Sequence, residues 1–232
     1  MTQFSDAHYK ASGVVIIIDY RSPIRHQHKI MDTLTNQNIQ KTVDLYFIDS
    51  SIVVEKYGDI STWDVSHVTN MSWLFDGKDL RHLDLSKWDV SNVTSMLGMF
   101  ARSTVYPKNG IENWLPLNLA DCDYMFYNAY WRGEDALFTL NSFSTNKLKF
   151  KTYGMFNNFY LVKEQKRLGV EVDITFWSAD NVDQENCYAM FGGDSLTYSQ
   201  GFLDSMQSWL STEFPWSDEM NMKKLFIDYE LE

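Results

Sequence analysis

Cysteine is scarce in this sequence, and long hydrophobic runs are absent. Only 2 of the 232 residues are cysteines, too few for the disulfide framework that stabilises many small secreted domains. The apolar run at residues 14–18 is five residues long, whereas a helix that spans a bilayer needs about 20. Residues 1–6 lack the basic and apolar regions of a signal peptide. We therefore expect a cytosolic protein that does not insert into a membrane.

Positive charge is also in short supply. The chain has 20 Lys and Arg against 31 Asp and Glu, a net charge of −11. This balance disfavours direct binding to nucleic acid or to anionic membrane surfaces, which both need a basic footprint. The imbalance lies in residues 57–232, since residues 1–56 hold six charges of each sign. An acidic surface attracts a basic partner protein, although the charge can instead serve only to keep an aromatic-rich chain soluble.

The sequence lacks a recognisable catalytic constellation. His26 and His28 form an H-x-H pair that is able to chelate zinc, but an exposed basic loop is the simpler interpretation. Asp121 and Asp123 place two carboxylates close together, as an acid–base site requires. They flank Cys122 at a repeated position, however, where a solvated face is the simpler interpretation. We expect a protein that is not an enzyme and that holds no metal and no cofactor.

What the sequence does contain is a segment that occurs twice, 25 residues apart. Residues 63–75 read W-D-V-S-H-V-T-N-M-S-W-L-F and residues 88–100 read W-D-V-S-N-V-T-S-M-L-G-M-F, so eight of thirteen positions are identical. Self-similarity at a period of roughly 20–50 residues is the signature of a repeat protein. The pair of residues that closes the segment recurs at spacings of 25, 26, 30, 35 and 35, at Phe75, Phe100, Phe126, Phe156, Phe191 and Phe226. We count about six degenerate repeats over residues 57–232.

Each repeat is predicted to be a short strand, a turn and a short helix. Residues 80–85 follow the L-x-x-L-x-L spacing of leucine-rich strands, and residues 170–176 alternate with period 2. Ser66 is placed to cap a helix, and residues 68–75 carry apolar groups on one helical face. Because one such unit cannot bury its apolar face alone, we expect the units to stack into a short α/β solenoid.

Residues 1–56 do not follow the repeat. Residues 13–20 and 43–49 are predicted to be buried strands, with a helix at residues 28–39 between them. An open stack of repeats exposes its first apolar layer, so we interpret this region as an N-terminal α/β cap. A separate small domain is the alternative.

The repeat register accounts for both cysteines and for half of the tryptophans. The residue four positions before each closing phenylalanine is a mid-sized group: Met71, Met96, Cys122, Thr152, Cys187 and Met222. The two cysteines are therefore expected to be buried thiols, too far apart for a disulfide. Four tryptophans occupy equivalent points and are predicted to be structural, namely Trp63, Trp88, Trp114 and Trp177.

With these motifs in place, residues 88–100 resemble the BspA-type leucine-rich repeat of mycoplasma and lactobacillus surface proteins. The resemblance is strong over residues 57–100, extends in eroded form to residue 226 and is absent from residues 1–56. It implies a right-handed solenoid that binds other macromolecules without chemistry of its own. Members of that family are typically exported and displayed on the cell surface for adhesion.

The residues that break the repeat are the candidates for partner binding, because aromatic anchors dominate binding hot spots. We predict a protein-binding face of aromatic and acidic side chains, with burial of the aromatic residues as the alternative. The predicted residues are Trp73, Asp76, Asp79, Asp123, Tyr124, Tyr127, Tyr130, Trp131, Trp209 and Trp216.

Three functions remain open from the sequence. The first is a non-catalytic cytosolic inhibitor that masks a basic surface of a partner, such as a phage-encoded anti-CRISPR protein or a toxin immunity protein. The second is a fragment of a bacterial surface adhesin, as the resemblance implies. The third is a metal-dependent hydrolase that uses His26 and His28.

Overall fold

The structure is a computed structural model, and the chain divides into two compact units, Met1–Met31 and Asp32–Glu232. The residues that it describes are 10–11, 14–15, 33–134, 137–140, 142–143, 151–164, 166–173 and 189–191. In the first unit, β1 (Lys10–Ala11) pairs antiparallel with β2 (Val14–Val15). The rest of the strand predicted at residues 13–20 lies outside the described residues. The proposed boundary between residues 56 and 57 stays a prediction.

The second unit begins with two helices where the sequence analysis placed a strand. These are α1 (Ile39–Ile48) and α2 (Ser50–Tyr57). The Asp49 carboxylate between them accepts a hydrogen bond from the Ser51 N–H and caps α2. The strand predicted at residues 43–49 is therefore wrong. Of the helix predicted at residues 28–39, residues 33–38 are not helical and residue 39 begins α1, while residues 28–32 lie outside the described residues.

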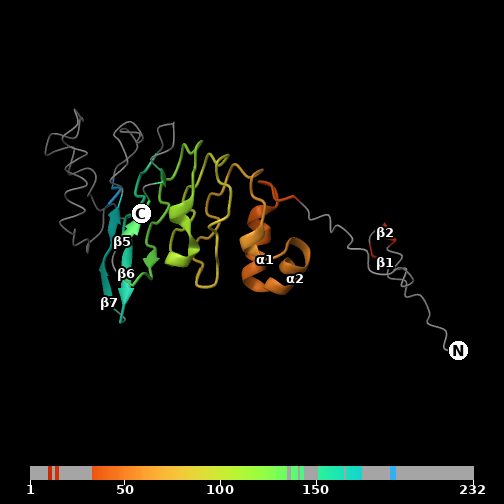
Figure 1. Cartoon of the computed structure of the whole chain (residues 1–232), viewed down its shortest axis with the longest axis horizontal. Helices are drawn as coiled ribbons and strands as arrows, with labels where there is room; N and C mark the ends of the chain where they lie inside the picture. The colour runs from red at the N-terminus through yellow and green to blue at the C-terminus, as the bar shows by residue number, and fades with distance from the viewer. Residues whose placement is uncertain are drawn as a thin grey trace, which may run out of the picture. The chain divides into compact units, whose positions relative to one another are not determined.

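Tertiary packing explains this difference. Ile39, Val43 and Phe47 recur every four residues and so lie on one face of α1. The Phe47 ring meets the Phe75 ring edge-on at 6.3 Å, and the Tyr46 ring meets Trp63 at 5.9 Å. The β-branched and aromatic composition favours a strand, but a helix brings these side chains together over the first repeat. Figure 1 shows α1 and α2 beside the first coils of the repeat region.

The remainder is a mixed α/β arrangement with small sheets. One sheet has the order β3-β4-β6-β7, in which β3, β4 and β6 are parallel and β6 and β7 form an antiparallel pair. The other pairs β5 with β8 in parallel. The strands are β3 (Thr104–Val105), β4 (Tyr130–Trp131), β5 (Leu137–Thr139), β6 (Tyr160–Lys163), β7 (Lys166–Gly169) and β8 (Glu171–Asp173). Single turns of 3-10 helix lie at Ile60–Thr62, Pro107–Asn109 and Ile111–Asn113.

Successive copies of the repeat lie side by side and exchange backbone hydrogen bonds. Alternate N–H groups of one copy donate to carbonyls of the next at 2.8–2.9 Å, with Met71, Trp73, Phe75 and Gly77 as donors and Ser95, Leu97, Met99 and Ala101 as acceptors. The same pattern joins the copies that end at Phe100, Phe126 and Phe156. The N–H of Phe156 also donates to the carbonyl of Met190 at 2.7 Å, so five copies are linked within the described residues.

The short helix predicted in each repeat is wrong for the copies described here. Residues 71–78 form tight turns, in which the N–H of Leu74 donates to the carbonyl of Met71 and the N–H of Lys78 to that of Phe75. The predicted cap Ser66 instead donates its hydroxyl to Asp64. Turns and a helix place apolar side chains at similar spacings, so the pattern alone did not separate them. We call residues 71–77 and their equivalents in later copies the turn ribbon.

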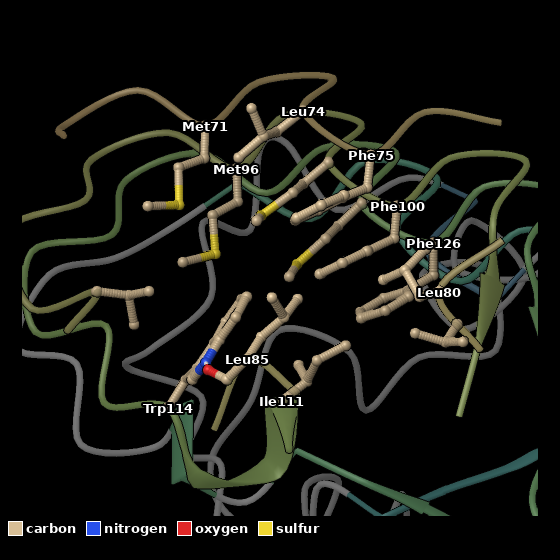
Figure 2. Packing of buried hydrophobic residues seen from close by; sticks show 14 of the residues in the cluster. Met71, Leu74, Phe75, Leu80, Leu85, Met96, Phe100, Ile111, Trp114 and Phe126 are labelled. Carbon is tan, nitrogen blue, oxygen red and sulfur yellow. Dashed lines mark hydrogen bonds between the residues drawn. The ribbon is translucent and has the colours of Figure 1, made fainter. Parts of the chain in front are cut away.

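The core is built from columns of equivalent side chains. Phe75, Phe100, Phe126, Phe156 and Phe191 stack ring on ring, with centroids 5.4–5.6 Å apart. Trp63, Trp88 and Trp114 form a second column at 6.2 and 6.3 Å. Figure 2 shows Phe75, Phe100 and Phe126 one behind another, beside the row of Met71 and Met96. The structural role predicted for these three tryptophans is confirmed, while Trp177 lies outside the described residues.

The indole N–H groups of two tryptophans inside this core have hydrogen-bond partners. The indole N–H of Trp88 donates to the Ile60 carbonyl at 2.9 Å, and that of Trp114 donates to the Leu85 carbonyl at 2.8 Å. Cys122 is a buried, free thiol, as predicted. Burial raises the pKa of this thiol well above its usual value, so it stays protonated and unreactive. Cys187 lies outside the described residues.

Aspartate side chains accept backbone hydrogen bonds at the bends of each copy. The carboxylates of Asp59, Asp64, Asp84 and Asp89 each accept a hydrogen bond from the N–H two residues later. The serine hydroxyl also donates to Asp64 and Asp84, and these bonds hold the pKa of both carboxyls below the usual 3.8. Hydrogen bonds to the ionised form favour that form.

The lowered pKa values of Asp64 and Asp84 predict that the folded protein loses stability in acid. Because the folded-state pKa of Asp64 and Asp84 is depressed, their contribution to stability is full above the unfolded-state pKa near 3.8. It is lost as the pH falls through the lower folded-state pKa. The Tm measured by circular dichroism is expected to fall steeply below about pH 3.8. Asp64→Asn with Asp84→Asn keeps an acceptor that does not titrate, so the decline should be shallower. An equally steep decline in this variant would contradict the assignment.

Candidate interaction surface

The turn ribbon requires a left-handed backbone at the same position of every copy. That position holds Trp73, Gly98, Tyr124, Gly154 and Ala189, whose φ angles are 60°, 57°, 57°, 57° and 52°. Glycine adopts this conformation freely, whereas a bulky side chain there costs on the order of 1–3 kcal/mol. The tryptophan and the tyrosine therefore occupy positions that the backbone favours for glycine.

Large and small residues alternate along this column. A Cβ atom on Gly98 would lie 2.3 Å from the Cε3 atom of Trp73, so the indole covers the glycine of the next copy. The Tyr124 ring covers Gly154 in the same way, with a Cβ there 3.0 Å from the ring. Trp73 is nevertheless 41% exposed. Each large ring thus rests on a glycine and also faces solvent.

Tyr124 is the centre of a cluster of tyrosines. Its ring meets Tyr127 edge-on at 5.6 Å and Tyr153 at 5.2 Å. Burial, together with the neighbouring Tyr153, raises the pKa of Tyr124 to about 12, so its hydroxyl stays neutral. The carboxylate of Asp123 accepts a hydrogen bond from the Tyr153 N–H at 2.7 Å. We call Trp73, Tyr124, Tyr127 and Tyr153 the aromatic ribbon face.

The three acidic residues predicted for the binding face already have interaction partners within the fold. Asp76 accepts hydrogen bonds from two guanidinium nitrogens of Arg102 in the next copy, Nε and Nη2. Asp79 accepts from Arg81 at 2.9 and 2.5 Å. Burial opposes ionisation of Asp79, but hydrogen bonds from Arg81 hold its pKa below the usual value. Local arginines thus balance two of the three acidic residues predicted for the binding face, and the third holds the Tyr153 backbone.

The other predicted site residues fall into three groups. Trp131 is only 6% exposed, and its ring packs edge-on against Phe138 at 4.9 Å, so it belongs to the core. This placement corrects the prediction that it binds a partner. Tyr130 lies on β4 and is not part of the aromatic ribbon face. Trp209 and Trp216 lie outside the described residues.

Sequence reasoning missed part of this surface. Tyr153 was not predicted as a site residue, although it follows the Thr152 position of the repeat, next to the column of Trp73. The alternation of Trp73, Gly98, Tyr124 and Gly154 was the available signal, since the phenylalanine spacings align these residues. This alternation became significant only once the structure showed that these residues share a left-handed backbone.

The described part of the chain contains no group of three or more His, Cys, Asp and Glu placed to hold a metal ion. His26 and His28 lie outside it. None of the helices described is both long and apolar enough to cross a bilayer.

A family model described as "Mycoplasma protein of unknown function, DUF285" matches residues 44–167, more than half of the chain. The chain belongs to the DUF285 family. The DUF285 match runs from α1 to β7 and includes the whole aromatic ribbon face. It agrees with the mycoplasma side of the resemblance described above. No curated protein and no solved structure matches the chain significantly.

Proposed function

We propose that this DUF285 protein is a non-catalytic binding module of the kind carried by mycoplasma surface proteins, and that the aromatic ribbon face contacts its partner. The observation that carries the proposal is the left-handed backbone of Trp73 and Tyr124. Strained residues that the fold does not require point to a function. Gly98, Gly154 and Ala189 occupy the same backbone position in other copies, so folding alone does not require a large ring there.

Rigid aromatic rings suit a binding surface. Tyrosine and tryptophan supply a large contact area with few torsion angles to freeze, and they are enriched among binding hot spots. Here the ring of Trp73 rests on Gly98 and that of Tyr124 on Gly154. The rings are therefore oriented before a partner arrives, which reduces the entropy lost on binding.

The scaffold that we propose is a short right-handed solenoid of the BspA-type leucine-rich-repeat kind, with about six repeats reaching residue 226. The hydrogen bonds between adjacent copies and the phenylalanine column support this proposal. Each coil contacts its neighbours, as expected of a repeat array.

Display on the cell surface is the setting we favour. The family described as mycoplasma proteins fits the adhesin hypothesis better than the inhibitor hypothesis. The inhibitor hypothesis, including an anti-CRISPR or immunity role, gains no support from the family, and the two ion-paired aspartates weaken the case for an open acidic mask. A cytosolic location stays a prediction.

A binding experiment tests the proposal. The labelled full chain is incubated with cultured epithelial cells, and cell-bound protein is measured by flow cytometry over a concentration series. Trp73→Gly with Tyr124→Gly is expected to weaken binding by about 30-fold or more, because removing a hot spot costs about 2 kcal/mol or more. Glycine suits the backbone at both sites, so circular dichroism should show an intact fold.

Leu117→Ala is the matched control, since Leu117 is an exposed apolar residue outside the aromatic ribbon face. It should leave binding unchanged. Equal binding by the wild type and the glycine variant would contradict the role of the ribbon face. Absence of the protein from intact mycoplasma cells probed with antibody would instead contradict surface display.

A further inference from the structure

A second surface lies on the solvent side of the β3-β4-β6-β7 sheet. Side chains alternate between the two faces of a strand, and Val105, Trp131 and Leu161 point into the core. Their neighbours Tyr130 and Arg132 therefore point outward. The outward residues are Tyr106, Tyr130, Arg132, Tyr160, Val162 and Arg167, since Val162 pairs with Arg167 across β6 and β7. We call these residues the Tyr/Arg face.

Arg167 is fixed in place on this face. Its guanidinium carbon lies 5.4 Å from the centre of the Tyr130 ring and 5.2 Å from that of Tyr160. One of its nitrogens donates to the Tyr130 hydroxyl at 3.0 Å, and the Tyr160 hydroxyl donates to Asn158 at 2.8 Å. A guanidinium that is already stacked and oriented loses little entropy when it binds an anion.

Among the residues that the structure describes, Arg132 and Arg167 form no ion pair with a carboxylate. In the described part of the chain the ion pairs of arginine are those of Arg81 with Asp79 and of Arg102 with Asp76. Arg132 donates to a backbone carbonyl, that of Val162, at 3.1 Å. Two exposed guanidinium groups that have no carboxylate partner within the described residues thus lie on one face of a protein whose net charge is −11.

We propose that the Tyr/Arg face binds a short acidic segment of a partner protein, with Arg132 and Arg167 each holding an Asp or Glu carboxylate. The planar guanidinium fork matches a carboxylate with two parallel hydrogen bonds. Tyr130 supplies a hydroxyl beside Arg167 to orient the bound group. This site is separate from the aromatic ribbon face and does not depend on the function proposed for it.

The contacts on this face distinguish a peptide from other anions. Sugar rings and nucleic-acid bases bind by stacking on open aromatic faces, but Arg167 lies over both Tyr130 and Tyr160. A long polyanion would also meet the repulsion of a chain with net charge −11. A short acidic peptide needs no open aromatic face and meets less repulsion than a long polyanion.

Fluorescence anisotropy with a labelled octaglutamate peptide and the full chain tests this inference. At low salt the wild type is expected to bind the peptide, and Arg132→Gln with Arg167→Gln should weaken binding at least 10-fold. Lys166→Gln is the matched control, because Lys166 is adjacent to Arg167 on β7 and points to the opposite face. It removes the same charge and should change the affinity less than 2-fold.

A conservative variant keeps the test informative if Arg167→Gln fails to fold. Arg167→Lys retains the charge and loses the fork, so it should still weaken octaglutamate binding several-fold. Three results would overturn the inference. They are no peptide binding by the folded wild type, an equal loss with Lys166→Gln, and tighter binding of a heparin octasaccharide or of oligo-dT than of octaglutamate.

Discussion

Replacing Phe126 with alanine is expected to lower the free energy of unfolding by about 3–5 kcal/mol, the usual range for removing a buried phenylalanine. Phe126 is fully buried, and its ring stacks between Phe100 at 5.4 Å and Phe156 at 5.6 Å. It also meets Phe138 at 5.1 Å and Phe159 at 5.4 Å. Its removal therefore leaves a cavity in the middle of the phenylalanine column.

Urea unfolding followed by circular dichroism measures this loss. Leu117→Ala, at a residue that is 38% exposed, is the control and should change stability by no more than about 0.5 kcal/mol. A loss below about 1 kcal/mol for Phe126→Ala would mean that the neighbouring rings collapse into the space, so the column would not be a rigid stack.

Replacing Gly98 with alanine is expected to destabilise the protein by at least about 2 kcal/mol, because two effects add. The φ angle of +57° strains any residue that carries a Cβ. The new Cβ would also lie 2.3 Å from the Trp73 ring, so the ring would have to move away from residue 98. The displaced indole should change the intrinsic fluorescence as well as the unfolding curve.

Two further variants separate strain from collision. Gly77 has a φ angle of +66° but no atom within 4 Å of the new Cβ, so Gly77→Ala reports strain alone, about 1–2 kcal/mol. In a Trp73→Gly background, Gly98→Ala should lose its additional penalty and approach the Gly77→Ala value. Strictly additive effects of the two substitutions would show that Trp73 does not rest on Gly98.

The repeat unit was predictable because the same residue types return at the same positions. The phenylalanine spacings of 25, 26 and 30 residues identified the rings that stack. They also placed Cys122 in the buried column that begins with Met71 and Met96. Such equivalence needs no knowledge of the backbone, since identical positions in adjacent copies must contact one another in any regular stack.

The backbone conformation was not predictable in the same way. Val68, Met71 and Leu74 have the spacing of a helical face, but their copy forms the turn ribbon. Its N–H groups find acceptors in the adjacent copy, which a single segment does not contain. Residues 43–48 have the composition of a strand but form a helix, because the helix covers the exposed end of the core.

Of the two candidate surfaces, the sequence predicted one in part and the other not at all. The aromatic residues Trp73, Tyr124 and Tyr127 were identified as residues that break the repeat, whereas Trp131 was wrongly included. Exposure separates them, and exposure depends on neighbours from other copies. The Tyr/Arg face was not predicted, because Arg132 and Arg167 are 35 positions apart and meet only through the pairing of β4, β6 and β7.

The sequence by itself determined that this is an acidic repeat protein, which side chains form its core columns, and that Cys122 is a core thiol. Those properties follow from composition and from the spacing of equivalent residues. Only the tertiary structure decided that each copy forms turns in place of a helix, that the indole of Trp73 rests on a glycine of the next copy, and that Asp76 is paired with Arg102 of the next copy. Each of these depends on a contact between copies, and the partner in such a contact is chosen by the way adjacent coils align.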